Sequence, residues 1–255
     1  MLNPFEPGPA AAFALFATRL GGLVLIAPVY SARTVPVAVR TALVLLITAA
    51  MAPALVGQAT VVVTPATFAS ELLIGFAIGF GAAIFVGATE VAGDILALQG
   101  GLSGAATLDP LTGIQSQALS HFLKLLVVTL LLVGGGHILM LEALADSIVA
   151  LPPGQPIAAA DGMLTMAMLG GSLFTVGVQI AAPVMAAVFV GNLAMGVLAR
   201  IAPQMQVFML AYPLQIVISL LVLMLSLPLL GVTMAGWNEH YRTTVIGLFD
   251  VLGGG

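Results

Sequence analysis

Residues 93–117 read GDILALQGGLSGAATLDPLTGIQSQ and lie between two long apolar runs of the chain. Three glycines lie close together at 100, 101 and 104, and the pairs Asp109-Pro110 and Thr112-Gly113 follow. Glycine and proline at this density end helices, and such pairs are typical of turns. An irregular polar segment in an apolar chain needs water or protein around it, because unpaired backbone is not tolerated in hydrocarbon. The stretch therefore predicts an irregular central loop, and we hypothesise that it lines or closes a passage.

The composition predicts a membrane-associated protein. Of the 255 residues, 61% are hydrophobic and 6% are charged, and the mean hydropathy is +1.20. A soluble domain carries roughly a quarter charged residues, so much of this chain must face lipid or other apolar protein. Six Lys and Arg residues and a net charge of −4 argue against a nucleic-acid partner. The chain contains no cysteine, which excludes a disulfide framework.

The apolar runs predict an all-α fold of about six long helices in a single domain, 1–255, that ends in a tail at 236–255. At about 20 residues for each crossing, the length of the chain allows that number. Prolines at 183, 213 and 228 predict kinks in the later helices. The runs span residues 10–29, 37–55, 67–98, 115–133 with its continuation at 138–151, 163–199 and 207–234. The tail carries Trp237, Tyr241 and Arg242, and we expect it to be interfacial or extramembrane.

Small residues recur every four positions along the third run. Gly75, Gly79, Ala83 and Gly87 share one helix face, which Glu71 precedes. Such a stripe lets another helix approach to close backbone contact. We therefore expect this face to pack against a neighbouring helix.

Six ionisable residues within or beside the apolar runs are candidates for polar contacts: Arg19, Glu71, Glu90, Asp94, Lys124 and His137. Intramembrane charges are costly and usually indicate a cavity or a partner. Glu90 and Asp94 are four residues apart on one helix face, so they could share a proton, bind a cation or pair with Lys124. The alternatives are ion pairing between helices or subunits, which is the more common arrangement, and exposure to water because the helix does not lie in lipid. His137 follows three glycines and suggests a metal or proton site, although a lone histidine more often has a structural role.

No enzyme motif accompanies these charges. The sequence lacks a phosphate-binding loop, an HExxH zinc motif, a GxSxG nucleophile motif and paired CxxC motifs. We therefore expect no enzymatic activity, no catalytic residue, no cofactor and no metal site.

Residues 196–216, GVLARIAPQMQVFMLAYPLQI, resemble the signature of the FliR family of flagellar type III export proteins. Gln215 stands where that signature has a basic residue. Further matches follow in the family's order along the chain: Arg19 with Ala27-Pro28, Val35-Pro36, Glu71–Gly75 with Gly79-Phe80, Gln99–Ser103 with Asp109-Pro110, and Gly135 with His137. The resemblance covers most of the chain.

The resemblance implies a subunit of the flagellar export gate. Such proteins assemble with FliP and FliQ in the bacterial inner membrane, at the flagellar basal body. FlhB lies at the cytoplasmic entrance, and unfolded flagellar proteins are the substrates. The resemblance also implies helical hairpins, partly above the membrane plane in the assembly, and a fusion of a P-like N-terminal part with a Q-like C-terminal part.

The resemblance also assigns two groups of residues. A plug loop seals the channel, and the family's assembly motif follows the fifth run. The plug loop comprises Gly104, Ala105, Ala106, Leu108, Asp109, Pro110, Leu111, Gly113 and Ile114; the assembly motif comprises Arg200, Pro203, Gln204, Met205, Phe208 and Pro213.

Two other functions compete with a plugged gate. A six-helix transporter would use Glu71, Glu90, Asp94 and Lys124 for proton coupling, but transporters usually contain two related halves and we find no clear internal repeat. A passive structural subunit of an injectisome export gate would close the ring of subunits without gating it.

Overall fold

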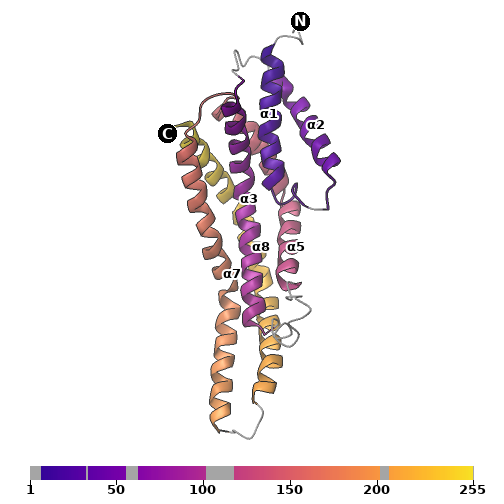
Figure 1. The fold of residues 1–255 in the computed structure, drawn as a ribbon. Coiled ribbons are helices and arrows are strands. Elements are labelled where there is room, and N and C mark those ends of the chain that lie inside the picture. Colours follow the sequence, from indigo (N-terminus) through magenta and orange to yellow (C-terminus); the bar gives the residue numbers. More distant parts are fainter. Residues whose placement is uncertain (1–6, 33, 56–62, 102–117, 202–206, 255) are drawn as a thin grey trace. The chain divides into compact units, whose positions relative to one another are not determined.

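The computed structural model of the protein describes residues 7–32, 34–55, 63–101, 118–201 and 207–254 (Figure 1). Within these ranges the secondary structure is helical, with no strand, which confirms the all-α prediction. The helices are α1 (Pro7–Ile26), α2 (Val37–Leu55), α3 (Pro65–Gln99), α5 (Ala118–Val133), α6 (Gly136–Ala150), α7 (Ala159–Ile201) and α8 (Val207–Gly253).

The expectation of six long, kinked helices is not confirmed. By length and composition, two of the described helices, α3 and α7, can cross a membrane, and a third span exists if α5 and α6 count as one broken helix. Pro183, Pro213 and Pro228 all lie inside continuous helices. The break between α5 and α6 falls at Gly134 and Gly135, where Gly135 has φ 76°, a left-handed conformation that glycine adopts at no steric cost.

Two boundaries differ from the sequence prediction. Helix α3 continues through Gly93 to Gln99, so the first part of the stretch 93–117 is helical and the break begins at Gly100. Glycine is tolerated inside a helix when packing compensates its conformational freedom. Residues 236–253, expected to be a separate tail, continue α8.

The helices form two compact units, and α3, α5, α7 and α8 contribute to both. The first unit comprises residues 1–84, 131–170 and 236–255. The second unit comprises residues 85–130 and 171–235.

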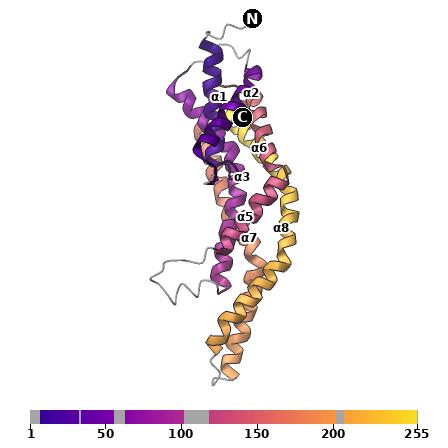
Figure 2. The same ribbon diagram turned by 90° about the vertical axis from the view of Figure 1, so that its right-hand side faces the viewer.

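In the first unit, α1 lies beside α2 and also packs closely on α3 (Figures 1 and 2). A Cβ atom added to Gly75 would lie 1.9 Å from the carbonyl oxygen of Arg19, and one added to Gly22 would lie 2.6 Å from that of Leu72. Gly79 is similarly close to Leu23 and Ile26. The stripe of small residues therefore brings two helix backbones into direct contact, as expected.

The end of α8 completes the core of the first unit. Trp237 and Tyr241 are buried, and their rings stack with centroids 5.0 Å apart. The Tyr241 hydroxyl donates a 2.9 Å hydrogen bond to the carbonyl of Ile78 on α3. These aromatic residues are core residues rather than interfacial ones, and their burial ties the C-terminal helix to α3.

The second unit is built from the remaining parts of α3, α5, α7 and α8. Within it, the later part of α7 and the earlier part of α8 run side by side (Figure 2). Its buried core comprises Ala92, Leu96, Leu123, Ala181, Val184, Val188 and Leu223. Gly87 contacts Leu173 of α7, so the stripe of small residues faces a different helix in this unit.

Replacing Gly75 by alanine tests the backbone contact. The added Cβ would overlap the Arg19 carbonyl, and because that neighbour is backbone, α1 and α3 must move apart. We expect the free energy of unfolding in detergent micelles to fall by about 1–3 kcal/mol. Gly171→Ala is the matched control: no atom lies within 4 Å of its added Cβ, so it should raise stability slightly or leave it unchanged. Equal stability of the two variants would contradict the close contact.

Candidate functional site

The first unit contains a buried ion pair that connects three helices. Arg19 on α1 and Glu71 on α3 are 0% and 1% exposed, and the Arg19 Nε atom lies 2.6 Å from the Glu71 Oε2 atom. Two charges removed from water are stable only when their remaining hydrogen-bonding atoms are also satisfied. The surrounding groups meet that requirement.

The guanidinium of Arg19 closes the C-terminal end of α6. Its Nη1 atom donates to the carbonyl and the hydroxyl of Ser147, both at 2.9 Å, and its Nη2 atom donates to the carbonyl of Leu151 at 2.8 Å. The carbonyls at a helix C-terminus lack helical partners and carry partial negative charge, which favours a cation. The backbone N–H of Gly154 donates to the second oxygen of Glu71 at 2.9 Å. Every polar arm of the pair therefore has a partner.

His137 lies in the first turn of α6. Its carbonyl accepts a 2.9 Å hydrogen bond from the Tyr30 hydroxyl, and burial raises the pKa of Tyr30, which keeps that phenol protonated as a donor. The Nδ1 atom of His137 is buried and has no partner among the described residues. No group of three or more His, Asp or Glu side chains in the described ranges is arranged to hold a metal ion.

Changing Arg19 to methionine should destabilise the first unit strongly. It leaves the Glu71 carboxylate buried without its cation, which typically costs about 3–5 kcal/mol. The double variant Arg19→Met with Glu71→Met should lose less of the free energy of unfolding, because no buried charge remains. The exposed pair Arg242–Glu142, with side chains 56% and 51% exposed, supplies the control, and Arg242→Met should cost less than about 1 kcal/mol. Chemical denaturation in micelles measures the free energy of unfolding of all three variants. If the double variant were as unstable as Arg19→Met alone, an unpaired buried charge would not be the cause of the loss.

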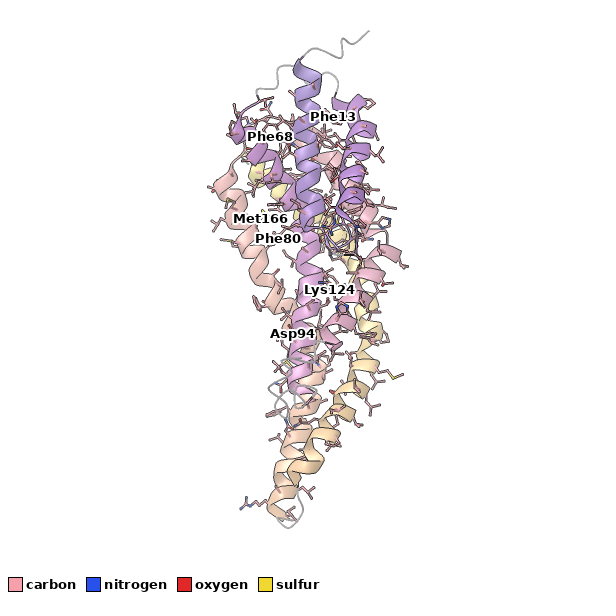
Figure 3. The ribbon with its side chains drawn as sticks, turned by 45° about the vertical axis from the view of Figure 1, so that its right-hand side comes forward. Phe13, Phe68, Phe80, Asp94, Lys124 and Met166 are labelled. Carbon is pink, nitrogen blue, oxygen red and sulfur yellow. The ribbon has the colours of Figure 1, made fainter. Side chains whose placement is uncertain are left out.

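The second unit holds the other charged cluster, where α3 and α5 meet. A Cβ atom added to Gly93 would lie 2.4 Å from the Cα atom of Ser120, so the two backbones touch there. The Ser120 hydroxyl donates a hydrogen bond to the Asp94 carboxylate. One turn away on each helix, Lys124 forms an ion pair with Glu90. Their side chains are 41% and 40% exposed, so this pair is partly solvated, unlike Arg19–Glu71. Figure 3 labels Asp94 and Lys124 in this part of the second unit.

A cleft of about 240 Å³ opens beside this cluster and is lined by Glu90, Asp94, Ser120 and His121. Of the alternatives that the sequence left open for Glu90 and Asp94, the structure shows the ion pair between Glu90 and Lys124. Asp94 and His121 are exposed. The role of Ser120 and His121 was not apparent from the sequence, because it depends on how α5 faces α3.

The structure describes part of the assembly motif. Arg200, at the end of α7, and Pro213, in α8, are exposed. Pro203, Gln204 and Met205 lie outside the described residues, and Phe208 falls within α8. Gln215 donates a 2.5 Å hydrogen bond to the side-chain oxygen of Asn192 on α7, so this residue joins the two helices.

The predicted plug loop lies wholly outside the described residues, which end at Gly101 before it and resume at Ala118. The structure does place the two helices that flank it. These helices, α3 and α5, touch at Gly93 and Ser120.

Comparison with known proteins identifies the family. The family described as bacterial export proteins, family 1, matches residues 10–240. A flagellar biosynthetic protein FliR from Pectobacterium carotovorum is 33% identical over 237 residues, which cover 92% of this chain and 88% of that protein. Proteins with the same name from Escherichia coli and Caulobacter vibrioides are 31% and 32% identical to this chain. Each match covers 90% of this chain, and the matches cover 88% of the Escherichia coli protein and 92% of the Caulobacter vibrioides protein. The chain therefore belongs to the FliR family of bacterial export proteins.

Proposed function

We propose that this protein is a subunit of the flagellar type III protein export gate and is required for building the flagellum. The observation that carries the proposal is the FliR-family match across residues 10–240. The apolar composition and the two helices long enough to cross a membrane support a place in the bacterial inner membrane. Its proposed partners are FliP, FliQ and FlhB, and its substrates are unfolded flagellar proteins.

The proposed mechanism is gating by residues 104–114 rather than catalysis. Glycines at 104 and 113 allow many backbone conformations, so the loop can move without breaking a helix. Apolar side chains between them, such as Leu108, Leu111 and Ile114, would exclude water from the closed channel. The close contact of α3 and α5 at Gly93 and Ser120 supports this role, because it holds both ends of the loop on packed helices. The energy for export comes from other parts of the apparatus.

The charges of the first unit favour a structural role over proton transport. Both oxygens of Glu71 already accept hydrogen bonds, one from Arg19 and one from Gly154. A proton relay needs a carboxylate that can exchange protons with water or a neighbour, and this one is enclosed and fully paired. The transporter hypothesis therefore loses one of its four candidate residues.

Deleting residues 104–113 tests the plug. In the assembled complex we expect ion conductance across the inner membrane to rise well above background, because the apolar seal is removed. A second variant, with Leu108, Leu111 and Ile114 changed to serine, keeps the loop length and should also leak. Val149→Ser, at a residue 84% exposed on α6, is the control and should not leak. Background conductance in an intact complex would leave a passive structural subunit as the better explanation.

Changing Arg200 and Gln204 together to alanine tests the assembly motif. Arg200 is exposed at the end of α7, where it is free to contact another subunit. We expect the variant to lose co-purification with FliP and FliQ. Arg242→Ala, an exposed arginine of the first unit, should co-purify normally. Recovery of the complex with the double variant at the wild-type yield would remove the assembly role.

A further inference from the structure

The cleft between α3 and α5 carries one carboxylate, Asp94, that forms no ion pair with a Lys or Arg among the described residues. Glu90 is paired with Lys124, whereas the hydrogen bond that Asp94 accepts among the described residues comes from the neutral hydroxyl of Ser120. The adjoining residues 102–117 contain no Lys, Arg or His. Of the Lys and Arg side chains that the structure describes, Lys124 lies in this cluster and pairs with Glu90. Among the described residues Asp94 therefore has no Lys or Arg partner, and the cleft also contains the ionisable side chain of His121.

Exposed apolar side chains accompany this charge on both helices. Leu98 follows Asp94 by one turn on α3 and is 70% exposed. Leu125 follows His121 by one turn on α5 and is 54% exposed, and the adjacent Phe122 is 50% exposed. Residues four apart share a helix face, so Leu98 extends the face of Asp94 on α3 and Leu125 extends that of His121 on α5, next to the polar lining of the cleft. Neither water nor lipid suits such a surface, since water leaves the apolar rim exposed and hydrocarbon leaves an anion unpaired.

We propose that this cleft is a docking site for a helix of another protein that inserts an arginine side chain beside Asp94. An anion within an apolar rim is complementary to a cation carried on an apolar helix, and protein interfaces combine these features at their centres. Arginine suits the site better than lysine, because its guanidinium is weakly hydrated and can donate two parallel hydrogen bonds to one carboxylate. The cleft volume of about 240 Å³ is below the usual range for small-molecule pockets, which favours one inserted side chain.

The site differs in chemistry from the other ion pairs of the chain. Arg19–Glu71 is enclosed and complete, and Arg242–Glu142 pairs two exposed side chains. Asp94 alone among these carboxylates receives a neutral donor in place of a cation. The inference does not rest on the plug proposed above, because a docking face would serve a gating subunit and a passive one equally.

Site-specific photo-crosslinking in native membranes tests the docking site in the full chain. A photoreactive amino acid replaces Leu98 or Leu125, and mass spectrometry identifies the crosslinked peptide. We expect a protein peptide with an arginine within one helical turn of the attachment point. Asp94→Asn, which keeps an acceptor for Ser120, should lower the crosslink yield about tenfold, as expected for loss of a charge-assisted hydrogen bond. Asp94→Glu should retain most of the yield, and Glu142→Gln, in the first unit, should leave it unchanged.

A charge exchange completes the test. Asp94→Arg should abolish the crosslink, and changing the partner's arginine to aspartate should restore it. Unchanged yield with Asp94→Asn, crosslinks to lipid alone, or failure of the charge exchange would each overturn the proposal. These outcomes are separable from failure of the plug, which is measured by conductance and leaves the crosslink unaffected.

Discussion

The buried pair of Arg19 and Glu71 is the interaction on which the first unit depends. A charge in an apolar interior is tolerated only when each of its polar atoms is paired, and the pair meets this condition through Ser147, Leu151 and Gly154. These partners come from one helix end and the turn that follows it. The pair therefore fixes where α6 ends relative to α1 and α3. Because the buried charges are paired only in this arrangement, they connect the three helices in a specific way.

Close backbone contact makes this pair geometrically attainable. Gly75 lies one turn after Glu71 on α3, and its Cα faces the carbonyl of Arg19 itself. A larger residue there would separate the helices and lengthen the distance between guanidinium and carboxylate. The glycine stripe and the ion pair thus support each other: small residues bring the backbones together, and the charges specify the register in which they meet. Apolar packing alone, which is not directional, specifies register less strictly.

The sequence predicted the positions of helices better than the side-chain contacts between them. The apolar run at 37–55 coincides with α2, and the run at 67–98 lies within α3, because these helices follow directly from continuous apolar composition. The sequence singled out Arg19 and Glu71 but not the acceptors Ser147 and Leu151, since more than a hundred residues separate them from Arg19 and ordinary serines and leucines carry no local signal. The burial of Trp237 and Tyr241 was missed for a related reason: an aromatic pair beside an arginine is typical of a membrane interface, and tertiary packing overrides that local pattern.

The carboxylates of Glu71 in the first unit and Asp94 in the second unit lie in different surroundings. In the first unit Arg19 and Glu71 are buried, and the polar atoms of both side chains are paired within the unit. In the second unit the carboxylate of Asp94 is exposed. Large apolar residues are exposed in both units, such as Val149 in the first and Met224 in the second, at 84% and 70%. Monomeric proteins rarely leave such surfaces uncovered. Both units therefore present apolar surface that lipid or another protein must cover, while the Arg19–Glu71 pair stabilises the first unit from within.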